Sequence, residues 1–168
     1  MGFIISQLNK HHDKKSFSCG NEMLDNYLKK QARQDVDRKL SVCFILTHSE
    51  SEKEIIGYYT LSNSSIRREQ LSENLLQKLP PSYNSLPVTL LGRMARDVKF
   101  KGQDIGNHLL IDALKKSYEV SSNSIASMAV IVDPIDDQAI AFYTKYGFIQ
   151  LESGKMFLPM DTISQLFN

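Results

Sequence analysis

The sequence predicts one α/β domain (residues 1–168) with a mixed, mostly antiparallel sheet and flanking helices. The prediction depends on the length of 168 residues, an average composition, and an order of strand-like and helix-like segments with no internal repeat. Hydrophobic residues make up 42% and charged residues 23%, which excludes a disordered tail, a collagen and a disulfide scaffold. The net charge of +1 is far below that of a protein that coats DNA.

The first half of the chain combines strands with one amphipathic helix. Asn21 is a suitable N-cap, and apolar residues recur at three- and four-residue spacing from there to Val36. Apolar runs between polar loops predict strands, and a short helical segment is expected before Pro80. The expected strands cover 2–8, 40–47 and 55–65, the helix 21–36 and the helical segment 67–79.

The second half predicts a parallel crossover. A long strand, a turn and a strong helix are followed by a buried apolar strand. Asp136 can cap a further helix, and Gly147 supplies a left-handed C-cap. The expected elements are strand 87–98, turn 99–104, helix 105–118, strand 126–132, the capped helix to 146, strands 148–151 and 156–159, and a small final helix.

The turn between residues 99 and 107 is the most informative stretch. Free N–H groups at a helix N-terminus bind anions, and Gly102 and Gly106 let the backbone approach such a group closely. Lys99 and Lys101 add positive charge. From this turn alone, a phosphate site and an ordinary strand-to-helix turn both remain open. It is neither a Walker loop nor a dinucleotide fingerprint, because the required residues and glycine spacing are missing.

Other sites and locations are weaker predictions. Cys19 and Cys43 fit one bridge or two thiols, and a nucleophilic Cys–His pair lacks an oriented histidine. The four histidines lack metal-ligand spacing, so no metal is expected. No apolar run approaches the ~20 residues of a membrane span, and the chain does not open on a signal-peptide core. A cytoplasmic protein with no membrane association is expected.

The second half of the chain resembles the GCN5-related N-acetyltransferases, or GNAT family. The resemblance is carried by the order of strand 87–98, turn, helix and strand, followed by a helix that contains Phe142-Tyr143 and ends at Gly147-Phe148. The resemblance implies a sheet whose central parallel strands splay apart, and acetyl-CoA as acetyl donor. It also implies a set of cofactor-binding residues: Met94, Ala95, Arg96, Lys101, Gly102, Gln103, Asp104, Ile105, Gly106, Asn107 and Phe142.

Two residues of the turn depart from the family pattern. Lys101 replaces the usual Gln or Arg, and Asp104 replaces the central glycine. A carboxylate beside a pyrophosphate is unfavourable unless it points away. We expect Asp104 to cap the helix and face solvent, with Lys101 supplying the compensating charge; the alternative is weakened cofactor affinity or an inactive site.

The resemblance places the catalytic tyrosine at Tyr143. A phenol with a pKa of ~10 can protonate a leaving alkyl thiolate of similar basicity, although a core aromatic beside Phe142 is the structural alternative. A backbone N–H near Met94 or Ala95 is expected to stabilise the oxyanion. The central strand contains no Glu or His as a base, which favours an α-amine (pKa ~7.7–8) over a lysine amine (~10.4) as acceptor.

Three segments resemble one GNAT branch more closely, the toxins of bacterial toxin–antitoxin pairs. These segments are residues 17–34, Gly57 to Ser62, and Leu90 to Ala95. This implies acetylation of the α-amine of aminoacyl-tRNA, an antitoxin partner and a homodimer. A tRNA needs clustered positive charge, and Lys29, Lys30 and Arg33 are candidates, each with a solvated face as the alternative. Arg93 and Arg96 point to opposite faces of their strand, and Arg93 is expected to aim into the cleft.

The sequence therefore predicts an acetyl-CoA-dependent N-acetyltransferase that acts by direct transfer, with an aminoacyl-tRNA as the favoured acceptor. Two alternatives remain open at this point: an enzyme acting on a small-molecule or peptide amine, and a non-catalytic module that binds acyl-CoA or an antitoxin. The departures at Lys101 and Asp104 keep the second alternative open.

Overall fold

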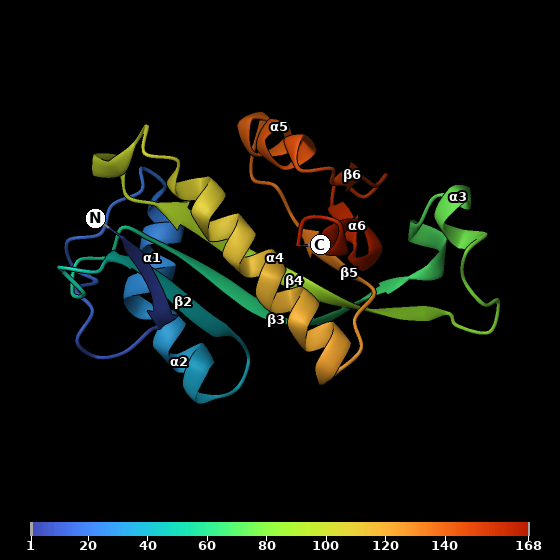
Figure 1. Ribbon diagram of the computed structural model, residues 1–168, viewed down its shortest axis with the longest axis horizontal. Coiled ribbons are helices and arrows are strands. Elements are labelled where there is room, and N and C mark those ends of the chain that lie inside the picture. Colours follow the sequence, from blue (N-terminus) through green and yellow to red (C-terminus); the bar gives the residue numbers. More distant parts are fainter. Residues whose placement is uncertain (1, 168) are drawn as a thin grey trace. The chain divides into compact units, whose positions relative to one another are not determined.

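The computed structural model describes residues 2–167. Its strands form a seven-stranded sheet in the order β1-β2-β3-β4-β5-β7-β6 (Figure 1). β1 with β2, β2 with β3, β5 with β7 and β6 with β7 are antiparallel. β4 (Ser85–Arg96) and β5 (Ala129–Val132) are parallel, so the mixed sheet with flanking helices is confirmed.

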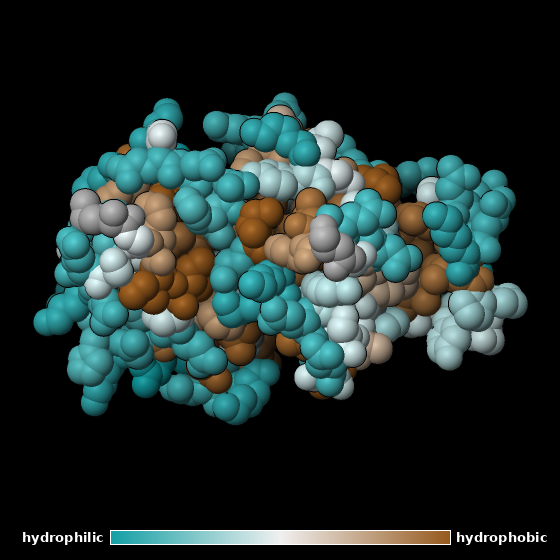
Figure 2. Space-filling view, viewed as in Figure 1, coloured by the Kyte–Doolittle hydropathy of each residue, from teal (hydrophilic) through white to brown (hydrophobic). Residues whose placement is uncertain are grey.

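The chain divides into two compact units, described here one at a time. Unit 1 contains Met1–Ser62 and Leu91–Ala113, and unit 2 contains Asn63–Leu90 and Leu114–Asn168. Strands β3 (Gly57–Arg67) and β4 and helix α4 (Ile105–Asn123) run through both. No helix within residues 2–167 is long and apolar enough to cross a membrane. The face drawn in Figure 2 is mostly hydrophilic, with hydrophobic residues gathered in patches.

Unit 1 is a sheet with helices on both faces. β1 (Phe3–Gln7) pairs with β2 (Val42–His48), and β2 pairs with the start of β3. Alternating residues of these strands face opposite sides. On one side Cys43, Ile45 and Tyr58 join Tyr27 and Leu28 of the first helix in a buried cluster. On the other side Tyr59 donates a 2.5 Å hydrogen bond to Asp112 of α4.

The helix expected at 21–36 is two helices. α1 (Glu22–Lys30) starts at the predicted cap, where Leu24 N donates to Asn21 Oδ1 at 3.1 Å. α2 (Ala32–Asp37) starts after Gln31, whose backbone leaves the helical conformation at φ −123° and ψ −34°. The apolar spacing continues across this break because both helices pack on the same cluster through Leu28 and Ala32.

Unit 2 is built around β5 and the start of β4. Its buried cluster includes Leu86, Val88, Ile131 and Phe157. Ala139 N donates to the predicted cap Asp136 at 2.8 Å, and Gly147 has the left-handed φ of +96° expected after that helix. The remaining elements are the 3-10 helix η1 (Arg68–Gln70), α3 (Glu73–Leu76), α5 (Asp137–Lys145), β6 (Ile149–Gln150), β7 (Met156–Pro159) and α6 (Met160–Ser164).

Gly57 is tightly surrounded by its neighbours in unit 1. A Cβ there would come within 2.9 Å of both Ala95 O and Leu109 Cδ1. We expect Gly57→Ala to lower the free energy of unfolding by about 1–3 kcal/mol through overpacking, as measured by urea denaturation. Gly2→Ala is the control, because its nearest neighbour, Ser49 Oγ, would lie 3.8 Å away. Equal midpoints for the two variants would contradict this account of the packing.

Candidate functional site

The turn that leads from β4 into α4 is built by unusual backbone angles in unit 1. The 3-10 helix η2 (Val98–Phe100) follows β4, and its cap Asp97 accepts a 2.8 Å hydrogen bond from Lys99 N. Gly102 then adopts φ +86°, and no atom lies within 4 Å of where its Cβ would be. The open space leaves this backbone approachable, as expected for an anion-binding turn.

Asp104 occupies the position where the family pattern has glycine, and the structure shows why glycine is usual there. Its φ is +62°, in the left-handed region. Aspartate is among the few residues other than glycine that visit this region, at a cost of roughly 1–2 kcal/mol for a typical side chain. Asp104 is exposed, and its carbonyl accepts from His108 N at 3.2 Å. Its solvent exposure agrees with the expectation.

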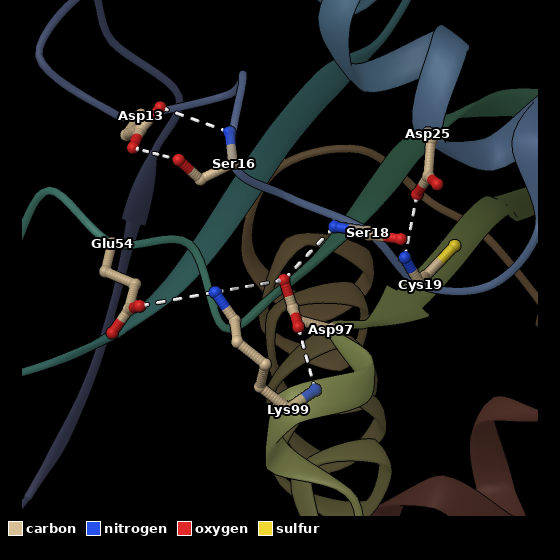
Figure 3. A network of polar contacts seen from close by, with 8 residues as sticks. All are labelled: Asp13, Ser16, Ser18, Cys19, Asp25, Glu54, Asp97 and Lys99. Atoms are coloured by element: carbon tan, nitrogen blue, oxygen red, sulfur yellow. Dashed lines mark hydrogen bonds and ion pairs between the residues drawn. The ribbon is translucent and has the colours of Figure 1, made fainter.

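The two lysines of the turn are in different electrostatic settings. Lys101 is exposed. Lys99 Nζ lies 3.6 Å from Glu54 Oε2 and 3.9 Å from Asp97 Oδ2 (Figure 3). These two carboxylates offset the charge of Lys99, so Lys101 is left as the stronger positive group for an anion at this turn.

The predicted residues at the end of β4 are partly or fully covered. Ala95 is buried, Met94 and Arg96 are half-buried, and Arg96 Nε has no hydrogen-bond partner among the described residues. Arg93 shares a face with Ala95, and its guanidinium carbon lies 3.6 Å from the centre of the Tyr27 ring. This cation–π contact ties β4 to α1, a role that the sequence did not suggest for Arg93.

The predicted basic residues lie on α1 and α2. Lys30 and Arg33 are exposed and Lys29 is half-buried. Arg33 Nε also lies 3.4 Å from Asp37 Oδ1, an exposed i,i+4 pair whose attraction is small in water. All three cations can therefore still contact a polyanion.

Tyr143 and Phe142 lie on α5 in unit 2. Tyr143 is only 8% exposed. Its ring packs against Phe142 at 5.3 Å and Phe148 at 5.2 Å between centroids. Burial raises the pKa of the Tyr143 phenol to about 12, so the hydroxyl keeps its proton throughout the neutral range.

The hydroxyl of Tyr143 differs from those of the other buried tyrosines. Tyr27 donates to Asp35 at 2.7 Å, Tyr58 to Leu24 O at 2.8 Å, and Tyr59 to Asp112. The Tyr143 hydroxyl makes no hydrogen bond to another residue within 2–167. A phenol that is carried on a well-packed ring and bonds to no described residue is available to a ligand.

The alternative sites have less chemical support. Cys19 and Cys43 are both free thiols. Burial, and then a hydrogen bond with Asp25, raise the pKa of Cys19 to about 11, and burial raises that of Cys43 to about 12. Neither is a reactive thiolate near neutral pH.

An open hollow of about 840 Å³ beside β1 and β2 contains none of the predicted site residues. In the described part of the chain, no three His, Cys, Asp or Glu residues are grouped to hold a metal ion.

Unit 1 contains the end of the strand, the turn and the start of the helix, and unit 2 contains the packed aromatic pair, that the resemblance to acetyltransferases predicts. The chain is 32% identical to the "tRNA-acetylating toxin" of Mycobacterium tuberculosis over 136 residues, or 81% of this chain and 78% of that protein. It is 28% identical to the "Probable toxin TacT" of Sinorhizobium fredii, covering 97% and 94% of the two chains. No protein-family model matches.

Solved structures give the same result. A tyrosine-to-phenylalanine variant of KacT has a TM-score of 0.92 at 29% identity, covering 99% of this chain and 100% of that one. AtaT in complex with acetyl-methionyl-tRNA has a TM-score of 0.90 at 28% identity, with the same coverage. The AtaTR complex with acetyl-CoA has a TM-score of 0.86 at 30% identity, covering 99% and 98%. This chain belongs to the GNAT toxins, the family of the tRNA-acetylating toxins.

The positive φ of Asp104 leads to an order of stabilities. Asp104→Gly should be as stable as the parent or more stable by up to about 1 kcal/mol, because glycine has no Cβ to strain. Asp104→Ala should lose about 1 kcal/mol, because alanine lacks the short polar side chain that makes this conformation tolerable. Urea denaturation measures both, with the exposed neighbour Gln103→Ala as control. An alanine variant as stable as the glycine variant would contradict the strain.

Proposed function

We propose that this protein transfers the acetyl group of acetyl-CoA to the α-amine of an aminoacyl-tRNA, and so blocks translation as a toxin. The observation that carries the proposal is the Tyr143 phenol, buried, protonated and without a protein hydrogen-bond partner in the described residues. The M. tuberculosis relative named for tRNA acetylation and the AtaT complex with acetyl-methionyl-tRNA support the choice of acceptor.

The acetyl donor is held by backbone groups and one lysine. The turn residues Lys101–Asn107 lie at the start of α4, where the N–H groups of a helix favour anions, and open space at Gly102 admits a pyrophosphate. Residues Met94–Arg96 offer backbone groups to the pantetheine arm, and Phe142 completes the set. The AtaTR complex with acetyl-CoA supports this donor.

Chemistry then requires one attack and one proton transfer. The acceptor nitrogen attacks the thioester carbonyl carbon, and the C–S bond breaks. The sulfur takes the Tyr143 proton, and the phenolate regains a proton from solvent. An α-amine, with a pKa of ~7.7–8, has a substantial neutral fraction near neutral pH, and after the attack its nitrogen releases the extra proton to solvent, so no side-chain base is needed. A backbone N–H near Met94 or Ala95 stabilises the oxyanion.

The acceptor and partners follow from surface charge and from the relatives. Lys29, Lys30 and Arg33 form a basic surface on α1 and α2 that contacts tRNA phosphates, and Arg93 adds a cation beside it. We place the protein in the cytoplasm as a homodimeric, single-domain enzyme with a cognate antitoxin. AtaT structures with the C-terminus of the antitoxin AtaR and a KacTA–DNA complex support the antitoxin.

The test is incubation with labelled acetyl-CoA and charged tRNA. Acetyl label that appears in the aminoacyl ester of tRNA supports the proposal. Transfer only to small amines or peptides favours the first alternative, and cofactor binding without any turnover favours a non-catalytic module.

Tyr143→Phe should lower kcat about 10²–10⁴-fold, because the leaving thiolate loses its proton donor. The free energy of unfolding and the Kd of coenzyme A should not change, because this hydroxyl pairs with no described residue. The matched control is Tyr58→Phe, which loses a hydrogen bond to Leu24 O. It should lose about 1 kcal/mol of stability and keep kcat. The assignment fails if turnover by Tyr143→Phe equals that of the parent.

Charge reversal of Lys29, Lys30 and Arg33 to Glu should weaken tRNA binding at least tenfold and flatten its dependence on salt, because fewer counterions are released. Filter binding at several salt concentrations measures both quantities. Reversal of the exposed Lys78 in unit 2 is the control. If affinity and salt slope match those of the control, this surface does not dock tRNA.

A further inference from the structure

Asp97 is the buried acidic residue of the described chain, with only 1% of its surface exposed. It follows β4 directly, and both of its carboxylate oxygens accept hydrogen bonds from backbone N–H groups. Oδ1 accepts from Lys99 N at 2.8 Å, and Oδ2 accepts from Ser18 N at 3.1 Å (Figure 3). One side chain thus joins two segments that lie far apart in the sequence.

Burial makes this junction rigid. A buried carboxylate costs several kcal/mol unless donors surround it, and hydrogen bonds to a charged acceptor are about twice as strong as neutral ones. Lys99 Nζ, at 3.9 Å from Oδ2, adds a nearby positive charge. If either segment moved away, the buried carboxylate would lose one of its two hydrogen bonds. This cost holds each segment in position beside Asp97.

The first segment is the anion-binding turn. Lys99 lies in η2, and the chain continues through the left-handed Gly102 and Asp104 into α4. Since Asp97 is the cap of η2, its side chain sets the start of the turn that would hold the pyrophosphate.

The second segment leads into α1. Ser18 O also accepts from Val98 N at 2.9 Å, so the loop and the turn are bonded in both directions. The next residue, Cys19, donates its N–H to Asp25 Oδ1 of α1 at 2.9 Å. Contacts therefore run without interruption from Asp97 to the helix that carries Lys29 and Lys30.

We propose that Asp97 is a positioning residue that places the donor turn and the acceptor-binding helix α1 together, so that its loss weakens binding of both substrates. The inference rests on the proposed function. Asp97 does not act as the base, because both of its oxygens already accept hydrogen bonds and its side chain is buried. Since both oxygens are already bonded to backbone N–H groups, Asp97 is not placed to react with a substrate, and turnover at saturation should survive its replacement.

The test is Asp97→Asn, which keeps the shape but puts an NH₂ group against one of the two backbone donors. We expect the Kd of coenzyme A, measured by calorimetry, and the Kd of total tRNA, measured by filter binding, each to rise at least fivefold. The kcat at saturating substrates should stay within twofold, with an unchanged pH profile.

Two controls separate this role from general stability. Asp13 lies in the same loop as Ser18, and its carboxylate accepts hydrogen bonds from Ser16. Because no hydrogen bond to the donor turn is lost, Asp13→Asn should leave both Kd values unchanged. Glu54→Gln removes only the outer ion pair of Lys99, so any effect should be smaller than that of Asp97→Asn. A lower melting temperature for Asp97→Asn with both Kd values unchanged would reduce Asp97 to a structural residue and overturn the proposal.

Other outcomes also decide it. A rise in only one of the two Kd values would refute the proposal that Asp97 positions both segments. A large loss of kcat with a shifted pH profile would show that Asp97 acts as a base, and would also refute it. If Asp97→Asn does not fold, hydrogen exchange on the parent protein takes its place: coenzyme A should increase protection in residues 16–21 as well as 97–107, and no change in 16–21 refutes the proposal. A parent protein that does not bind coenzyme A refutes the proposed function instead.

Discussion

The chain must pass from the end of β4 into α4 within the residues Asp97 to Asp104, and this reversal is the constraint on which the candidate donor site depends. It combines a buried carboxylate at its start with left-handed backbone at Gly102 and Asp104. The carboxylate fixes where the turn begins, and the left-handed residues redirect the chain into α4. An anion site made of backbone needs this kind of support, because backbone groups cannot reorient independently of the fold.

The tyrosines of the chain show how the same side chain serves two purposes. The hydroxyls of Tyr27, Tyr58 and Tyr59 bind partners within unit 1. Tyr27 joins α1 to α2, and Tyr58 and Tyr59 join β3 to α1 and to α4. Tyr143 is equally well packed through Phe142 and Phe148 but its hydroxyl has no partner in residues 2–167. A rigid ring with a free, protonated hydroxyl is suited to proton donation, because its position is fixed before a substrate arrives.

Local patterns predicted the elements and their caps well. Asn21, Asp136 and Gly147 signal helix ends through their own side chains or backbone, so their roles need no tertiary information. The break at Gln31 was missed because the apolar spacing continues across it. The parallel relation of β4 and β5 also followed from the pattern, since a long strand, a helix and a buried strand imply a parallel crossover.

Side-chain contacts between distant segments could not be predicted from the sequence. Spacing cannot show that Lys99 pairs with Glu54, that Ser18 bonds to Asp97, or that Arg93 lies over Tyr27, because each contact joins distant segments. The case of Arg93 matters most for the acceptor side. Its guanidinium is held on the Tyr27 ring, and the Tyr27 hydroxyl is held by Asp35. A cation restrained in this way loses little conformational entropy when it meets a phosphate or a carboxylate. The contact that ties β4 to α1 can therefore also prepare Arg93 to bind an anion, and the two roles reinforce each other.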